Sequence, residues 1–162
     1  MREEHSTSSE EETIDLARTF AQRLERGDVV ALRGELGTGK TRFVKGVCAA
    51  FGAVDHVSSP SFVILNRYEG RDRERRELYL YHLDLYRIRS IEEIYDIGYE
   101  EFVYGDGMTL IEWAEQLGEL VPPKRYEVCF SYGPKDSERL ISIELVDEPP
   151  VRKKTGNVGT QR

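Results

Sequence analysis

An α/β fold built around an open, ligand-binding sheet is predicted by three features of the sequence. Residues 29–32 form a short apolar segment, followed by a glycine-rich loop and then by a stretch with apolar residues at helical spacing. Two later segments, rich in apolar and aromatic residues, each carry an acid at or near their end, Asp84 and Glu112. Because open α/β sheets bind ligands at the carboxyl ends of their strands, we expect these acids and the loop at one sheet edge.

The glycine-rich loop matches the pattern G-x-x-x-x-G-K-[ST] at every fixed position; its residues are Gly34, Glu35, Leu36, Gly37, Thr38, Gly39, Lys40 and Thr41. Glycines allow backbone angles that a Cβ forbids, so successive N–H groups converge on an oxyanion, and the following helix adds its partial positive charge. The ammonium group of Lys40 suits the β- and γ-phosphates, and the Thr41 hydroxyl suits Mg²⁺. The segment therefore predicts a P-loop that binds a nucleoside triphosphate.

Length and composition indicate one domain. The 162 residues suffice for a single core, and we expect a domain over residues 1–148 with a basic, disordered tail over 149–162. The two cysteines, Cys48 and Cys129, lie far apart in apolar surroundings, which is typical of buried reduced thiols in a cytoplasmic protein. The first twelve residues are polar and no apolar run reaches membrane-spanning length, so we expect neither a secretory signal nor a membrane segment.

The net charge of −7 is unevenly distributed along the chain. The residues after Glu148 include four basic side chains and no acid, so the rest of the chain has 19 basic and 30 acidic residues, a net charge of −11. A domain with this negative charge is a poor direct ligand for polyanions such as nucleic acid. If nucleic acid is involved, we expect another protein to hold it.

A helix is predicted before the P-loop. Ser9 and Glu12 resemble a capping box, and an apolar stripe follows until Gly27; the stripe consists of Ile14, Ala17, Phe20, Ala21 and Leu24. After the P-loop helix, Pro60 fixes its own φ and keeps Ser59 out of the helical region, so residues 58–62 predict an extended loop. This loop is either a simple strand entry or a switch loop in which a serine hydroxyl senses the γ-phosphate or the metal.

Two hairpins and a pair of short helices are predicted next. Residues 62–68 and 78–86 predict an antiparallel hairpin with a charged tip, and Asp84 near its end is a candidate metal ligand. Residues 87–104 predict short helices that break at Gly98; their acids indicate a solvated face, with a partner surface as the alternative. Residues 126–132 and 139–146 alternate apolar and polar side chains, which predicts a closing hairpin.

Two further residues, Glu112 and Lys135, have more than one interpretation. Residues 108–111 predict a buried strand that ends in Glu112, so Glu112 competes with Asp84 for the metal. Alternatively, Glu112 is a first-turn acid of a helix predicted at 114–117. Trp113 is most simply a packing residue, and Lys135, in the turn of the closing hairpin, either solvates that turn or contacts a base or phosphate.

Four segments accompany the P-loop in a specific order: Ser59-Pro-Ser-Phe62, Tyr81-His-Leu-Asp-Leu-Tyr-Arg87, the stretch from Glu92 to Gly98, and Leu110-Ile-Glu-Trp113. Over roughly residues 9–146 this set resembles the TsaE family, the small P-loop ATPases of the bacterial tRNA threonylcarbamoyladenosine pathway. The chain has no Asn-Lys-x-Asp guanine reader, which disfavours a small GTPase, and no room for the lid and acceptor domains of a nucleotide kinase.

The resemblance implies a three-layer, P-loop NTPase-like α/β sandwich with a mixed, mostly parallel central sheet and antiparallel hairpin additions. It implies that Lys40, Asp84 and Glu112 are catalytic and that Thr41, Glu112 and Asp84 hold Mg²⁺. ATP or ADP would contact Glu35, Leu36, Gly37, Thr38, Gly39, Lys40, Thr41, Ser61, Trp113 and Lys135. The family commonly has threonine at the position of Ser61.

The resemblance also implies partners. The family ATPase does not modify tRNA itself; it binds the TsaB and TsaD proteins, and ATP hydrolysis permits repeated turnover by TsaD, so tRNA would be met only through the complex. A magnesium-dependent ATPase that is weak alone is therefore expected in the cytoplasm. Two alternatives remain: a P-loop small-molecule kinase, which needs an acceptor pocket, and a nucleotide-dependent switch that hydrolyses little.

Overall fold

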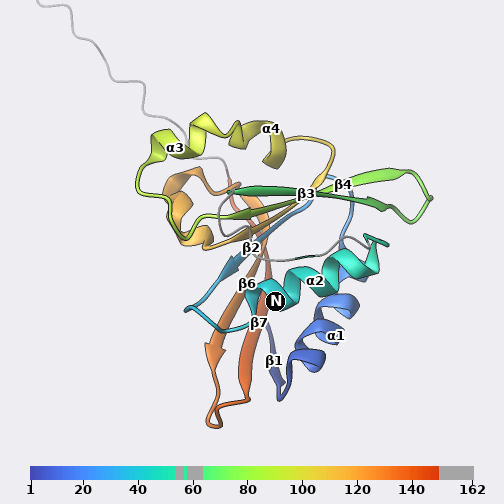
Figure 1. Cartoon of the computed structure of the whole chain (residues 1–162), viewed down its shortest axis with the longest axis vertical. Helices are drawn as coiled ribbons and strands as arrows, with labels where there is room; N and C mark the ends of the chain where they lie inside the picture. Colours follow the sequence, from blue (N-terminus) through green and yellow to red (C-terminus); the bar gives the residue numbers. More distant parts are fainter. Residues whose placement is uncertain (54–56, 58–63, 150–162) are drawn as a thin grey trace, which may run out of the picture.

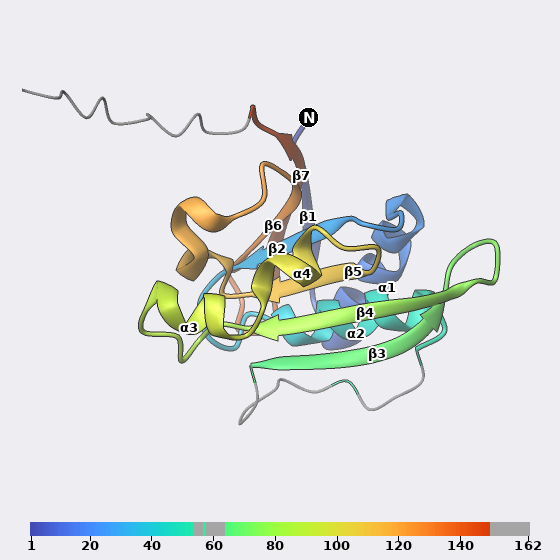
Figure 2. The same cartoon turned by 90° about the horizontal axis from the view of Figure 1, so that it is seen from above.

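The computed structural model describes residues 1–53, 57 and 64–149, which form a seven-stranded sheet with helices on both faces (Figures 1 and 2). Along the chain, the elements are β1 (Glu3–Thr7), α1 (Glu10–Phe20), η1 (Ala21–Arg23), β2 (Val29–Arg33), α2 (Lys40–Ala50), β3 (Leu65–Arg71), β4 (Glu77–Asp84), α3 (Ile91–Asp96), α4 (Tyr99–Val103), β5 (Met108–Glu112), η2 (Ala114–Leu120), β6 (Lys124–Tyr132) and β7 (Arg139–Asp147).

The sheet has a parallel centre and antiparallel flanks. Its strand order is β1-β7-β6-β2-β5-β4-β3. Strand β2 pairs in parallel with β5 and β6, and β4 pairs in parallel with β5. The hairpins β3–β4 and β6–β7 add antiparallel strands, and both hairpins were predicted from the sequence. The predicted mixed sheet with hairpin additions is therefore confirmed.

Helices cover the sheet on two sides, which gives three layers. On one face α1 and α2 pack over an apolar cluster that includes Phe20, Phe43 and Leu110. On the other face α3, α4 and η2 pack over a second cluster that includes Leu83, Ile94 and Leu117. In Figure 1 the strands β3 and β4 run across the view whereas β6 and β7 run down it, so the sheet is strongly twisted.

The predicted start of α1 is confirmed, but its predicted end at Gly27 is wrong, because the α-helix stops at Phe20 and a 3-10 turn follows only as far as Arg23. The Ser9 hydroxyl caps α1 by accepting a hydrogen bond from the backbone N–H of Glu12 (3.1 Å). Helix α2 lies against α1 at Gly46, where a Cβ would come within 2.3 Å of the carbonyl oxygen of Ile14. The break predicted between the short helices falls at Gly98, which has φ +72°.

One strand was missed by the sequence analysis. The first twelve residues were described only as polar, and no strand was predicted in them, but Glu3–Thr7 forms β1, which pairs antiparallel with β7 at the edge of the sheet. The side chains of Glu3 and His5 are only half-buried, and Thr7 is buried with its hydroxyl 2.8 Å from that of Thr13. The strand is held by pairing with β7, so its own composition carries little signal.

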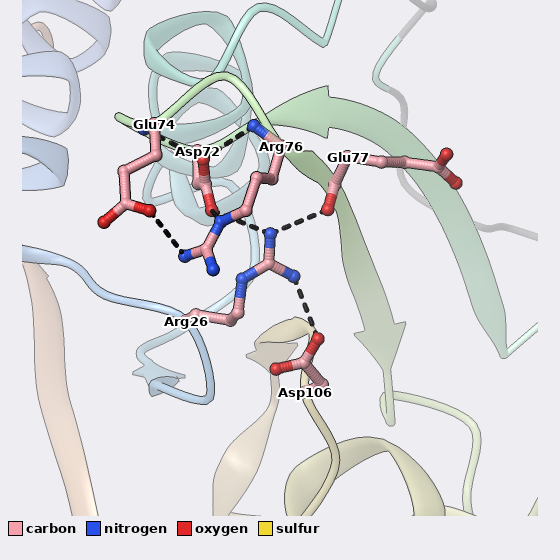
Figure 3. A network of polar contacts seen from close by, with 6 residues as sticks. All are labelled: Arg26, Asp72, Glu74, Arg76, Glu77 and Asp106. Atoms are coloured by element: carbon pink, nitrogen blue, oxygen red, sulfur yellow. Dashed lines mark hydrogen bonds and ion pairs between the residues drawn. The ribbon is translucent and has the colours of Figure 1, made fainter.

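A polar network joins three loops at the end of the sheet away from the P-loop (Figure 3). The Arg26 guanidinium donates hydrogen bonds to Asp72 (2.9 Å), to Asp106 (3.0 Å) and to the carbonyl oxygen of Glu77 (2.7 Å). Asp72 also pairs with Arg76 (3.0 Å). The network ties the β3–β4 turn to the segments that enter β2 and β5.

Both cysteines are free thiols: Cys48 is buried and Cys129 is half-buried. Burial raises the pKa of the Cys48 thiol to about 12. None of the described helices is long and apolar enough to span a membrane. The predicted disordered tail lies outside the described residues from position 150 onward.

Replacing Gly46 by alanine is expected to lower the free energy of unfolding by about 1–3 kcal/mol, because the added methyl group collides with the backbone of α1. Urea unfolding monitored by circular dichroism measures this change. Lys45→Ala, on the exposed side of the same helix, is the control and should stay within about 0.5 kcal/mol of the parent protein. Equal stability of Gly46→Ala and the parent would contradict the packing.

The acid sensitivity of the fold should depend in part on Asp72. The hydrogen bond from Arg26, together with those from Arg76, lowers the pKa of this carboxyl from 3.8 to about 2. A lowered folded-state pKa gives stability that is complete above about pH 4 and is lost as the pH falls toward 2. Between those values, Asp72→Asn should lose stability less steeply than the parent in acid unfolding curves, whereas Glu74→Gln should follow the parent.

Candidate functional site

The P-loop leaves the buried strand β2 and leads directly into α2. Gly34 has φ +146°, and a Cβ there would lie 2.7 Å from the carbonyl oxygen of Phe130, so glycine is required for this close approach to β6. Gly39 precedes α2 with φ +99°. The Thr38 hydroxyl donates to the carbonyl oxygen of Glu35 (2.7 Å) and closes the loop on itself. Strand, loop and helix therefore have the arrangement predicted from the motif.

Lys40 is folded back into its own loop. Its ammonium group donates to the carbonyl oxygens of Gly34 (2.6 Å) and Glu35 (2.8 Å) and lies 4.3 Å from the centre of the Trp113 ring. The residue is only 5% exposed. Burial lowers the pKa of Lys40, although the carboxylates of Glu112, Glu115 and Asp84 oppose this effect. The lysine is thus a desolvated charge held by groups that a phosphate could replace.

Glu112, the last residue of β5, connects the P-loop to the sheet. Its Oε1 accepts a hydrogen bond from the Thr41 hydroxyl (2.8 Å), and its Oε2 lies 2.6 Å from Nε2 of His82. The Nδ1 atom of His82 lies 3.3 Å from the Tyr68 hydroxyl. Both Glu112 and His82 are buried. A continuous line of polar contacts therefore runs from β3 through β4 and β5 to the start of α2.

Asp84 lies beside Glu112, since the two residues are register partners on the parallel strands β4 and β5. One carboxylate oxygen of Asp84 accepts a hydrogen bond from the backbone N–H of Tyr86 (3.0 Å). Glu112, the other candidate metal ligand, accepts a hydrogen bond from the Thr41 hydroxyl. Both stay candidate ligands.

Trp113 connects Glu112 to η2 through a left-handed backbone conformation with φ +57°. This conformation is uncommon for residues other than glycine. The indole ring packs against the Tyr86 ring, with 4.9 Å between the ring centres. The same indole ring also contacts the ammonium group of Lys40. The ring therefore packs as the sequence suggested and lies at the lysine, and its contact with nucleotide stays a prediction.

The tip of the β6–β7 hairpin contacts the P-loop from outside. The Tyr132 hydroxyl donates to the carbonyl oxygen of Leu36 (2.5 Å), and the Arg139 guanidinium donates to that of Gly37 (3.4 Å). Arg139 also lies 4.7 Å from the centre of the Tyr132 ring. Lys135, the residue predicted to contact nucleotide, lies in the hairpin turn with its side chain 80% exposed and 3.9 Å from Glu138.

The sequence analysis did not single out three of these residues. His82 was part of a quoted motif without a role, and Tyr132 and Arg139 were treated as hairpin residues. Of the three, only His82 had a sequence signal. It occupies the same every-second-residue pattern as Leu78 and Leu80, which places a polar residue on the apolar face of β4. Ser61, the predicted γ-phosphate sensor, lies outside the described residues.

The donor set suits a magnesium ion that is shared with a phosphate. Within the described ranges, no group of three or more His, Cys, Asp or Glu side chains could hold a metal without help. Mg²⁺ in nucleotide sites usually takes one or two protein oxygens and completes its shell with phosphate and water. The Thr41 hydroxyl and the Glu112 carboxylate, in direct contact beside a phosphate-binding loop, fit that requirement.

Comparison with known proteins identifies the family. The model of the family described as "Threonylcarbamoyl adenosine biosynthesis protein TsaE" matches residues 7–141. The chain belongs to the TsaE family. The tRNA threonylcarbamoyladenosine biosynthesis protein TsaE of Treponema pallidum is 41% identical over 123 residues, covering 76% of this chain and 85% of that protein. TsaE of Bacillus subtilis is 36% identical over 140 residues, covering 86% and 84%.

A solved structure agrees with this assignment. The crystal structure of Bacillus subtilis YdiB superposes with a TM-score of 0.73 at 32% sequence identity, covering 90% of this chain and 86% of that chain. The likeness confirms the P-loop NTPase-like fold. The family to which the chain belongs is thus one of tRNA threonylcarbamoyladenosine biosynthesis proteins.

Tyr132→Phe tests the contact between the hairpin and the P-loop. Loss of one hydrogen bond to the carbonyl oxygen of Leu36 should weaken the loop by about 1 kcal/mol, which corresponds to about fivefold faster amide hydrogen exchange in residues 34–39. Mass-spectrometric exchange measures this rate. Tyr104→Phe, at a tyrosine that is 65% exposed, is the matched control. Unchanged exchange in the loop of Tyr132→Phe would show that the hairpin does not restrain it.

Proposed function

We propose that this protein binds ATP with Mg²⁺ at the P-loop and hydrolyses it to ADP and phosphate. The observation that supports this most directly is the 2.8 Å contact between Thr41 and Glu112, next to the buried ammonium group of Lys40. A P-loop hydroxyl paired with an acid at a strand end is the combination that holds the metal in P-loop hydrolases.

The β- and γ-phosphates would take the place of the carbonyl oxygens that Lys40 now contacts. The ammonium group has three donors on a flexible stem, so it can turn from Gly34 and Glu35 toward the phosphates while the backbone N–H groups of the loop provide further donors. The Trp113 ring stays over the lysine and limits access of water. A poorly solvated ammonium group interacts more strongly with developing negative charge than a hydrated one.

Thr41 and Glu112 would hold the magnesium ion, with Asp84 beside them in register. When bound, Mg²⁺ withdraws charge from the phosphate oxygens. Glu112 would also orient the water that attacks the γ-phosphorus. The Arg139 guanidinium is occupied with the carbonyl of Gly37 and the Tyr132 ring, so we expect slow hydrolysis until a partner adds positive charge.

We further propose that the partners are the TsaB and TsaD proteins and that hydrolysis resets their complex between turnovers. The support is family membership together with the charge of the chain, which makes direct capture of tRNA unfavourable. In this role the protein meets tRNA only through the complex, and nucleotide state controls its affinity for the partners.

ATP turnover, with and without TsaB and TsaD, tests the function. Lys40→Ala should lower phosphate release at least hundredfold because it removes the buried charge at the phosphates, and omission of Mg²⁺ should do the same. Lys45→Ala, whose side chain is exposed on α2, should keep the parent rate. Hydrolysis by Lys40→Ala at the parent rate would refute the assignment. Transfer of phosphate to a metabolite instead of water would identify a kinase.

A further inference from the structure

His82 is a buried polar residue at a position where the strand otherwise presents apolar side chains. It follows Leu78 and Leu80 on the face of β4 that α2 covers, and its exposed fraction is 0%. An apolar residue would pack there without the free-energy cost of burying an imidazole. The choice of histidine therefore requires polar partners, and the structure shows two of them, Glu112 and Tyr68.

The two contacts define which ring nitrogen of His82 donates a hydrogen bond and which accepts one. A carboxylate only accepts hydrogen bonds, so Nε2 of His82 donates to Oε2 of Glu112 across 2.6 Å. In the neutral ring Nδ1 then accepts from the Tyr68 hydroxyl, 3.3 Å away. Because β3, β4 and β5 are adjacent strands of one sheet, the ring is fixed on both sides by rigid elements.

The two oxygens of Glu112 consequently have separate partners. Oε2 is bound to His82 within the sheet, whereas Oε1 points to the Thr41 hydroxyl at the P-loop. A free glutamate side chain has several rotamers, and an unrestrained one would have to be ordered again each time a ligand binds. With Oε2 anchored, Oε1 can exchange its contact with Thr41 for another ligand while the side chain keeps its direction.

We propose that His82 is the positioning residue that orients Glu112 toward the magnesium site, with Tyr68 orienting His82 in turn. The inference rests on the proposed function and adds the groups that hold the acid in place. Hydrogen-bonded partners behind metal ligands typically change metal affinity by 10- to 100-fold when removed. His82 itself touches neither nucleotide nor metal in this arrangement.

Two substitutions distinguish the contact of His82 with Glu112 from its contact with Tyr68. His82→Gln places an amide N–H near the position of Nε2 and keeps the donor to Glu112. His82→Asn is shorter, so its amide reaches only the region of Nδ1, beside Tyr68. Calorimetric titration of each variant with a nonhydrolysable ATP analogue, at a series of Mg²⁺ concentrations, gives the Mg²⁺ requirement for binding without any turnover.

His82→Asn should raise the Mg²⁺ concentration for half-maximal binding by about 10- to 100-fold, and leave binding of ADP without metal within about twofold of the parent. His82→Gln should recover most of the loss. In a protein that already carries Glu112→Ala, His82→Asn should have no further effect on the Mg²⁺ requirement, because it acts through that carboxylate. If the role of His82 were merely structural, His82→Asn would instead lower the melting temperature and weaken nucleotide binding equally with and without metal.

The outcomes are distinguishable. A folded His82→Asn protein with the parent Mg²⁺ requirement overturns the inference and leaves the proposed function intact. A parent protein that shows no magnesium-dependent nucleotide binding overturns both. If His82→Asn does not fold, Tyr68→Phe decides: loss of its hydroxyl should raise the Mg²⁺ requirement about two- to fivefold, and an unchanged requirement overturns the inference.

Discussion

The in-register parallel pairing of β5 with β2 and β4 determines where the acids of the site lie. Glu112 is paired with Leu32 of β2 and with Asp84 of β4. Both acids therefore lie at the carboxyl ends of their strands, next to the P-loop that follows β2. A shift of one residue would turn Glu112 to the opposite face, toward η2 and away from Thr41. Because the interior strands are buried on both faces, such a shift would also exchange the side chains that face the two helix layers. Both apolar clusters would have to repack, so the register is strongly determined.

Both buried charges of the site have hydrogen-bond partners within the protein. The Lys40 ammonium group and the Glu112 carboxylate are both nearly inaccessible to water, and each has hydrogen-bond partners of its own. Lys40 uses carbonyl oxygens, which are uncharged, and Glu112 uses a hydroxyl and an imidazole. The cost of burial is therefore met by hydrogen-bond partners within the protein, of which the carbonyl oxygens at Lys40 and the Thr41 hydroxyl at Glu112 can be exchanged for ligand atoms.

The elements that could be predicted from sequence are those that carry a local signal. The P-loop is defined by glycines and a lysine at fixed spacing, and the end of β5 by an apolar run that stops at Glu112. The first hairpin is defined by β-branched and aromatic residues around a charged turn, and the closing hairpin by alternation. Contacts between segments distant in sequence carry no such signal. The pairing of His82 with Glu112 depends on strand order, and the contact of Tyr132 with Leu36 depends on how far the β6–β7 hairpin extends. The order of strands in the sheet had to be known first.

Strand β1 completes the edge of the sheet beside β7, which has nine residues and presents Leu140 and Leu145 at its surface. A long unpaired strand with apolar side chains is a template for another chain. The five residues of β1 are short and polar, with two acids, so the edge that they offer to solvent is a poor one for continued pairing. Pairing with β1 thus covers residues 139–143 of β7, and a shortened chain that begins after Thr7 would leave this stretch open to pairing with another molecule.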